Sequence, residues 1–226
     1  MDRIVQKIIT IVIILSLLQL LLASPKVIDS KKKEIIINDI AIPVLNYHKV
    51  DEQKIALSIS SQEFEEQIKY LAKEGYHTIT PSEMMNALEY GTPLPEKPIM
   101  ITFDDGYLDN YTNAYPILKK YGFTATIFLV TGFIGNDPRF MNWEEIKEMK
   151  ANGFVFGSHT VNHKSLTELS YVELKNELLL SAEEIEQQLG HQELFFAYPT
   201  GTYTLNIAKI VESCGYRAAF TIKYGD

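Results

Sequence analysis

The sequence has few cysteines and few basic residues, and these shortages exclude some classes of protein. It has a single cysteine, Cys214, among 226 residues, which excludes an intrachain disulfide. Cys214 precedes Gly215 in an amphipathic pattern, so we expect an inert, half-buried core thiol. Basic charge is also scarce, because 21 Lys and Arg face 29 Asp and Glu, giving a net charge of −8. This balance argues against nucleic acid as a partner, since nucleic-acid binding needs clustered basic surface.

Long apolar runs are scarce too. The main one extends from Ile8 to Ala23, behind Arg3 and Lys7, and this order is typical of a signal peptide. The run is shorter than the ~20 residues of a membrane-spanning helix. We therefore predict a secretory signal peptide or an uncleaved signal anchor over residues 1–23. Either one places the rest of the chain outside the cytoplasmic membrane, secreted or at the cell surface, with membrane contact only through this segment.

The remaining chain divides into a linker and one domain. Residues 24–38 have mixed polarity, and their short basic run, residues 31–33, is predicted to be a solvated part of the linker rather than a lipid-binding patch. Residues 39–226 have a length that suits one α/β domain. Whether a last strand of this domain is missing beyond residue 226 stays open.

Within this domain, short apolar runs alternate with amphipathic helical patterns. Strands are predicted at 42–47, 77–79, 99–103, 125–130, 154–157, 194–198 and 218–222. Helices are predicted at 60–75, 80–91, 142–153, 170–189 and 206–214, with a further helix ending near residue 122. Because the strands are mostly apolar rather than alternating, they indicate a parallel sheet covered by helices. An open doubly wound sheet and a closed barrel both fit this order.

Polar motifs at the strand ends favour the barrel. They are Tyr47-His48, Asp104-Asp105, Ser158-His159 and Pro199-Thr200-Gly201. In a barrel these ends converge on one face, where catalytic residues collect, whereas an open sheet would spread them apart. We therefore predict an α/β fold, a distorted (β/α) barrel with about seven parallel strands.

Two of these motifs suit a divalent metal ion. Asp104 and Asp105 follow one apolar strand, and His159 and His163 follow another. Taken singly, the first motif suits a helix cap and turn, and the second suits a surface histidine beside a hydrogen-bonded one. Together they supply two imidazoles and a carboxylate for an ion, with one carboxylate left to move a proton. The combination predicts a metal-dependent hydrolase, with Ser158 and Thr160 as candidates for orienting the imidazoles.

These residues resemble a known family, the polysaccharide deacetylases of carbohydrate esterase family 4, or NodB-homology domains. The family motif T-F-D-D-G is complete at 102–106, and H-[ST]-x-x-H is complete at 159–163. The resemblance covers the chain from about residue 40 onward and implies a distorted (β/α) barrel. It further implies that Asp104 is the general base and that Asp105, His159 and His163 bind the metal.

The third family motif, R-x-P-[YF]-G, is altered. The matching segment is 197–201, where Ala197 stands in place of the arginine that orients the base in the family. The resemblance implies that the backbone N–H of Thr200, beside Pro199 and Tyr198, stabilises the oxyanion. A simple β-turn built on Pro-x-Gly is the alternative for this segment.

The general acid is predicted to come early in the chain. No histidine follows His191, so the late acid histidine usual in the family is missing. The Tyr47-His48 pair resembles the branch that deacetylates poly-β-1,6-N-acetylglucosamine, which implies His48 as the acid. A structural histidine at a strand end is the alternative. We expect His77 and His191 to be structural or exposed.

Aromatic residues near the motifs are candidates for packing on sugar rings. Trp143 is the foremost candidate, and the others are Tyr107, Phe133, Tyr198 and Tyr203. A place in the hydrophobic core is the alternative for each, because most aromatic side chains pack there.

The resulting expectation is a hydrolase that removes N-acetyl groups from N-acetylglucosamine units of an extracellular polysaccharide. Zinc is the expected metal, although iron, cobalt or nickel also suit two histidines and one carboxylate. A peptidoglycan or chitin-oligomer deacetylase would use the same chemistry. A glycoside hydrolase with a pair of catalytic carboxylates and a non-catalytic carbohydrate-binding domain stay open as well.

Overall fold

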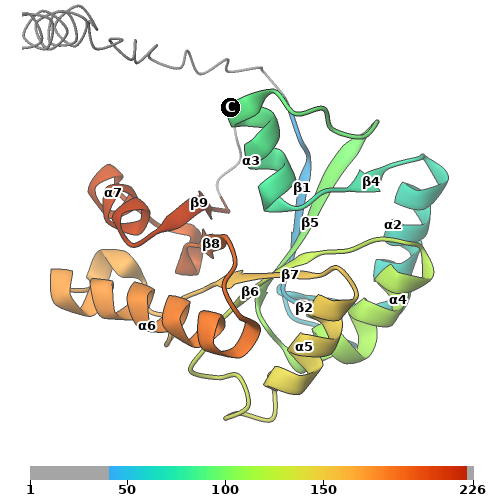
Figure 1. Cartoon of the computed structure of the whole chain (residues 1–226). Helices are drawn as coiled ribbons and strands as arrows, with labels where there is room; N and C mark the ends of the chain where they lie inside the picture. Colours follow the sequence, from blue (N-terminus) through green and yellow to red (C-terminus); the bar gives the residue numbers. More distant parts are fainter. Residues whose placement is uncertain (1–40, 223–226) are drawn as a thin grey trace, which may run out of the picture. The chain divides into compact units, whose positions relative to one another are not determined.

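A computed structural model describes residues 41–222 of the chain (Figure 1). The predicted signal segment and linker lie outside the described residues. Over residues 41–222, no helix combines the length and apolar character needed to cross a membrane.

A parallel sheet of seven strands forms the centre of the domain. Six strands follow one another in the order β1-β5-β6-β7-β8-β9, and β4 pairs with the start of β5. The bounds are β1 Val44–Tyr47, β4 His77–Thr78, β5 Pro98–Asp105, β6 Thr126–Leu129, β7 Val155–Ser158, β8 Leu194–Ala197 and β9 Tyr216–Phe220. The edge strands β1 and β9 do not pair with each other, yet Val44 and Phe220 line the same cavity. The sheet is therefore curled into a half-barrel, which confirms the predicted fold class.

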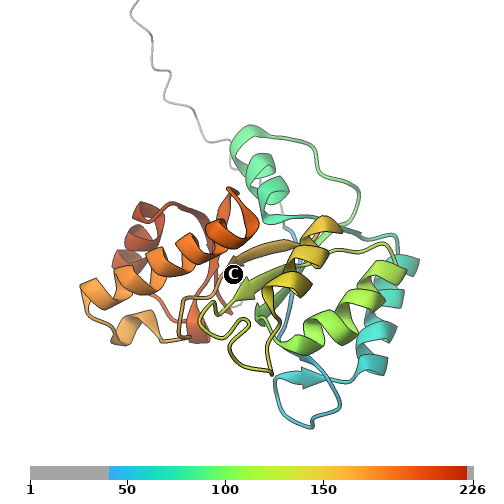
Figure 2. The same ribbon diagram turned by 60° about the horizontal axis from the view of Figure 1, so that its bottom comes forward.

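Helices surround the outside of this curled sheet (Figures 1 and 2). They are α2 Ser61–Lys73, α3 Pro81–Tyr90, α4 Tyr115–Lys120, α5 Trp143–Ala151, α6 Tyr171–Leu189 and α7 Leu205–Ser213. Four begin with a capping box in which a Ser, Thr or Asn and a Glu three residues later satisfy each other's backbone N–H groups. The predicted starts of these four helices are confirmed to within a residue.

Several elements differ from the sequence prediction. Strand β5 continues to Asp105, so both aspartates belong to the strand end. A π-helical turn, Asn110–Ala114, precedes α4 where an α-helix was expected. The strands β2, Lys49–Val50, and β3, Ser58–Ile59, form a separate parallel pair. These two-residue strands are too short for a periodicity to reveal. A short 3₁₀ helix also occurs at Leu166–Glu168, and Pro199–Gly201 forms a tight turn in which Thr200 has non-helical backbone angles.

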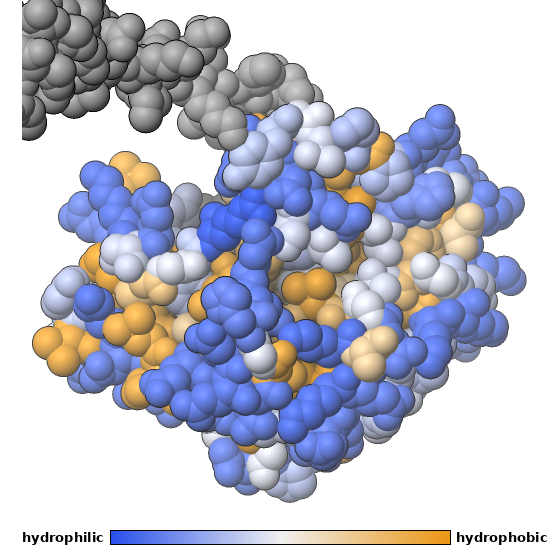
Figure 3. Space-filling view, viewed as in Figure 1, coloured by the Kyte–Doolittle hydropathy of each residue, from blue (hydrophilic) through white to orange (hydrophobic). Residues whose placement is uncertain are grey.

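A dense aromatic core fixes the strands that carry the polar motifs. The fully buried side chains include Phe64, Phe103, Phe128, Phe156, Phe195 and Phe196. Burial of each such side chain contributes about 1.5–3 kcal/mol, so the strand ends project from a rigid frame. Cys214 is half-buried against the cluster that contains Phe196, as predicted. The face shown in Figure 3 is largely polar, with several separate hydrophobic patches. The exposed hydrophobic residues of α6 are Tyr171, Val172, Leu179 and Leu180.

Candidate active site

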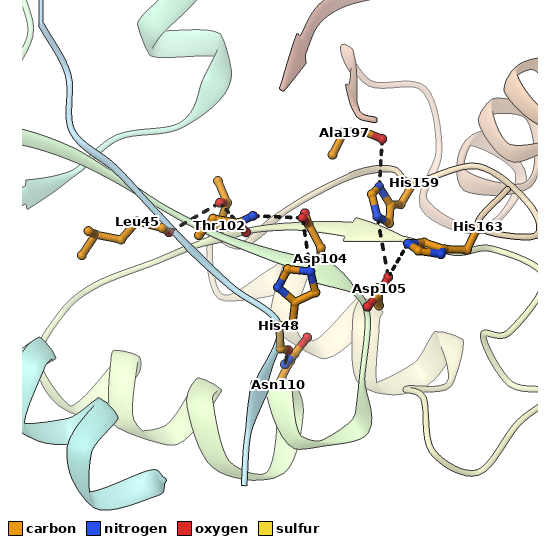
Figure 4. Close-up of polar contacts among 10 residues, drawn as sticks. Leu45, His48, Thr102, Asp104, Asp105, Asn110, His159, His163 and Ala197 are labelled. Carbon is orange, nitrogen blue, oxygen red and sulfur yellow. Dashed lines mark hydrogen bonds and ion pairs between the residues drawn. The ribbon is translucent and has the colours of Figure 1, made fainter. Parts of the chain in front are cut away.

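The ends of four strands of the sheet bring the predicted polar residues together (Figure 4). His48 follows β1, and Asp104 and Asp105 end β5. His159 follows β7, and Ala197 ends β8. Because the strands are parallel, all these ends lie at the same edge of the sheet. The convergence that the sequence motifs predicted is therefore present.

Asp105, His159 and His163 form a compact group of potential metal ligands. Asp105 Oδ1 lies 3.3 Å from His163 Nε2 and 3.6 Å from His159 Nε2. One ligand atom from each residue lies within 4.8 Å of the others. Asp105 Oδ1 is buried and has no hydrogen-bond partner. A buried carboxylate oxygen without a partner is costly, and a bound cation removes that cost. The donor set therefore fits a divalent metal.

His159 is held in the orientation that a metal ligand needs. Its side chain is buried, and Nδ1 lies 2.8 Å from the main-chain oxygen of Ala197. A carbonyl only accepts, so the ring proton is on Nδ1 and the Nε2 lone pair faces Asp105. The hydroxyls of Ser158 and Thr160, which were expected to orient the imidazoles, bond to other groups. Ser158 Oγ bonds to Ser181 Oγ and the Thr160 amide, and Thr160 Oγ1 accepts the His163 amide.

The loop that carries His163 is clamped by α6. Glu177 is 6% exposed, and its carboxylate accepts the amides of Val161 and Asn162, both at 2.9 Å. Its other oxygen accepts the Asn162 side-chain amide at 2.7 Å. His163 adopts a φ of 56°, a left-handed conformation that needs such support. Burial and the nearby His159 lower the pKa of His163, which favours the neutral form that binds metal.

Asp105 also has an unusual backbone. Its φ is 75°, and Gly106 follows with a φ of 81°. A Cβ atom on Gly106 would lie 2.8 Å from Leu129 Cδ2, so only glycine fits there. This tight turn points the two adjacent carboxylates in different directions (Figure 4).

Asp104 lies between Asn46 and His48. Asp104 is 5% exposed, and its Oδ2 accepts a hydrogen bond of 3.0 Å from Asn46 Nδ2. His48 Nε2 lies 3.8 Å from the same oxygen. The backbone of His48 is fixed by Asn110 of the π-helical turn, whose side-chain amide donates to the His48 carbonyl at 2.8 Å. A carboxylate and an imidazole thus share one corner of the site.

The segment matching the third motif contains a β-turn, the alternative that the sequence allowed, in which the Gly201 N–H donates to the Tyr198 carbonyl at 2.8 Å. Thr200 has a φ of 60° and an exposed side chain that bonds to Thr202. Tyr198 is buried and stacks on Tyr203, with ring centroids 4.9 Å apart. Burial, with a smaller effect of Tyr203, raises the pKa of Tyr198 to about 12. The role of the Thr200 N–H, beside Pro199, stays a prediction.

The predicted sugar-binding aromatics are spread over the fold. Trp143 lines a cavity together with Val161 and Leu180. The four motif residues that carry the carboxylates and imidazoles do not line this cavity; they are Asp104, Asp105, His159 and His163. Tyr107 is half-buried and stacks on Phe140, and burial and the Asp105 charge raise its pKa. Phe133 packs against the main core. The predicted role of Trp143 therefore has no support from its place in the fold.

Two histidines lie outside the site, as expected. His77 is exposed and bonds to the Glu96 carbonyl, and exposed His191 pairs with Glu186. Sequence reasoning missed Asn46, Asn110 and Glu177. Asn46 stands beside the Tyr47-His48 motif, but the others carry no local signal, because their role depends on contacts across the fold.

Known proteins resemble this chain in sequence and structure over the region that contains Asp104, Asp105, His159 and His163. Residues 91–219 match the family model described as polysaccharide deacetylase. YxkH of Bacillus subtilis (strain 168), named as a polysaccharide deacetylase, is 36% identical over 184 residues. That alignment covers 81% of this chain but 65% of YxkH, so the chain spans just under two thirds of that relative.

Two further proteins extend the comparison. A poly-β-1,6-N-acetyl-D-glucosamine N-deacetylase of Staphylococcus aureus is 28% identical, with 86% of this chain and 77% of the relative covered. The structure of the Streptococcus pyogenes deacetylase PplD in complex with acetate superposes with a TM-score of 0.79 at 31% identity. It covers 82% of this chain and 85% of PplD. With the family model matching more than half of its residues, this chain belongs to the polysaccharide deacetylase family.

Proposed function

We propose that this chain is a metal-dependent hydrolase that removes N-acetyl groups from N-acetylglucosamine units of an extracellular polysaccharide of the poly-N-acetylglucosamine type. The observation that carries the proposal is the grouping of two sets of side chains at one edge of the sheet. Asp105, His159 and His163 form a potential ligand cluster, and the Asp104–His48 pair lies beside it, for which we propose the roles of base and acid. The name of the Staphylococcus aureus relative supports this substrate class.

The residues divide the reaction between them. Asp105, His159 and His163 would hold a divalent ion, which would supply Lewis-acid chemistry that polarises the acetyl carbonyl and makes water more acidic. Asp104 takes the proton from water as its oxygen attacks the carbonyl carbon. The Thr200 N–H stabilises the oxyanion that forms. His48 then donates a proton to the amide nitrogen, the C–N bond breaks, and acetate and a free amine leave.

Zinc is the proposed metal, because two imidazoles and a carboxylate form a common open zinc site. Iron, cobalt and nickel suit the same donors, and metal analysis of the purified protein distinguishes them. We further propose that the enzyme acts outside the cytoplasmic membrane, because the sequence of residues 1–23 resembles a signal peptide or anchor.

Acetate release from defined oligosaccharides tests this function. The purified protein is expected to release acetate faster from β-1,6-linked than from β-1,4-linked N-acetylglucosamine oligomers. Faster release from the β-1,4-linked oligomers would assign a peptidoglycan or chitin-type substrate. Release of reducing ends without acetate would instead indicate a glycoside hydrolase, and sugar binding with neither product a carbohydrate-binding domain.

A further inference from the structure

The proposed base has no arginine to orient it. Ala197 occupies the position where the family motif has arginine, and its methyl group cannot donate a hydrogen bond to Asp104. The two arginines among residues 41–222 are engaged elsewhere. Arg139 pairs with Asp137, and Arg217 pairs with Glu89 and Glu193.

A small cavity adjoins Ala197. It has a volume of about 40 Å³, and Ala197 and Asp104 both line it. Asn46 and Thr102 line the same cavity. The carboxylate of Asp104 is therefore approached from the β1 side, by an amide, rather than from β8 by a guanidinium.

The hydrogen bonds around Asn46 fix the direction of this contact. Asn46 Nδ2 lies 3.0 Å from Asp104 Oδ2, and an ionised carboxylate only accepts, so the Asn46 NH₂ group must face it. The amide oxygen then faces Thr102, whose Oγ1 donates to Asn46 Oδ1 at 3.2 Å. Thr102 is 3% exposed and sits two residues before Asp104 in β5. The Thr102 hydroxyl, the Asn46 amide and the Asp104 carboxylate form one chain of hydrogen bonds.

We propose that Asn46 is a positioning residue for Asp104 and takes the place of the arginine absent at Ala197. The inference rests on the proposed role of Asp104 as the base. Asn46 holds one carboxylate oxygen, which leaves the rest of the group to face the attacking water. Because an amide carries no charge, Asn46 orients the base without adding positive charge to the site. His48, 3.8 Å from the same oxygen, is then the proton donor beside it.

Two substitutions at residue 46 separate orientation from packing. Asn46→Ala removes the donor, and a hydrogen bond to a charged group is strong enough that kcat should fall about 10- to 100-fold. Asn46→Asp keeps the volume but places a second carboxylate against Asp104, so kcat should fall further. KM and metal content should stay at wild-type values in both variants. A packing role predicts the opposite order, with the isosteric Asp variant closer to wild type.

Thr102 and a distant asparagine supply matched variants. Thr102→Val keeps the β-branched shape and removes the hydroxyl that orients the Asn46 amide, so kcat should fall by less than in Asn46→Ala. Thr102→Ser keeps the hydroxyl and should restore kcat. Asn152→Ala removes an exposed amide that bonds to the Glu148 carbonyl at the end of α5, and it should leave kcat unchanged.

A crystal structure of Asn46→Ala tests the inference without any substrate. The Asp104 carboxylate should rotate from its wild-type position or occupy more than one orientation, while Asp105, His159 and His163 stay in place. An unmoved carboxylate, together with a kcat within twofold of wild type, would overturn the role of Asn46. Absence of acetate release from the wild-type protein would instead contradict the proposed function, and the crystallographic comparison would still decide the role of Asn46.

Discussion

The two sides of the site are held in place by different means. On the metal side, Asp105 and His163 have positive φ angles, and His159 is tied to a main-chain carbonyl. On the base side, Asp104 and His48 depend on single contacts with neighbouring amide side chains, those of Asn46 and Asn110. The metal side thus combines left-handed backbone conformations with the buried Glu177 clamp, whereas the base side relies on individual amide side chains.

This difference indicates which part of the site tolerates substitution of its supporting residues. A left-handed conformation costs a non-glycine residue about 1–3 kcal/mol and persists only where its surroundings enforce it. The metal side therefore needs its complete motif together with the Glu177 clamp. The base side needs only one donor aimed at the carboxylate, and a donor can come from β1 as well as from β8. Ala197, which stands where the family motif has arginine, belongs to the base side.

Removal of a metal ligand should have the largest effect. His159→Ala deletes one of three donors, so metal affinity should fall on the order of 100-fold or more, beyond the loss typical of outer contacts. Acetate release should drop to the level of chelated wild-type protein. The control is His191→Ala, which removes an exposed histidine paired with Glu186. Metal retained at wild-type affinity in His159→Ala would contradict the assignment of this ligand.

Asp104→Asn should damage the chemistry while leaving the metal side intact. The amide cannot take a proton from water, so kcat should fall about 10²- to 10⁴-fold. Metal content and KM should remain at wild-type values, because Asp104 is not among the clustered ligands. Steady-state acetate release and metal analysis of the same preparation measure both quantities. Loss of metal from this variant would show that the two sides are not separable.

Glu177→Gln should weaken metal binding moderately. It replaces the carboxylate oxygen that accepts the Asn162 side-chain amide with an NH₂ group, so the His163 loop loses part of its support. We expect a reduction of about 10-fold in zinc affinity, measured by competition with a chromogenic chelator. Glu183→Gln on the exposed face of α6 is the control. Equal affinities in the two variants would refute the clamp.

Trp143→Ala should have the smallest effect on catalysis. Trp143 packs against the core and lines a cavity apart from the motif residues. Loss of this half-buried ring should lower the free energy of unfolding by about 1–3 kcal/mol, measured by urea denaturation. The kcat/KM for short oligomers should change less than about threefold, since a side chain outside the site removes little transition-state stabilisation. A large rise in KM with unchanged stability would restore the sugar contact predicted from the sequence.

The fold and the ligand cluster were predictable for identifiable reasons. Capping boxes and glycine ends marked the helices, and apolar runs marked the strands of the parallel sheet. The ligands were found because Asp105, His159 and His163 stand beside strand ends in two short motifs, and parallel topology brings such ends together.

The supporting contacts were not predictable in the same way. Glu177 reaches the His163 loop from the middle of a helix, where one glutamate looks like any other. The Ala197 carbonyl orients His159 through its main chain, which no side-chain pattern records. The hydroxyls of Ser158 and Thr160 differ in what they support. Ser158 Oγ bonds across the fold to Ser181 Oγ, a partner that local spacing does not reveal, whereas Thr160 Oγ1 accepts the backbone N–H of His163 and so supports its loop rather than its imidazole.

The two adjacent aspartates are assigned different functions, Asp105 as a metal ligand and Asp104 as the general base. Metal content and acetate release, measured side by side for Asp104→Asn and Asp105→Asn, separate these functions. We predict one bound ion per chain and almost no acetate release for Asp104→Asn, and neither ion nor acetate release for Asp105→Asn. Equal metal content in the two variants, or acetate release that persists in Asp105→Asn without metal, would show that the two aspartates do not divide the functions in this way.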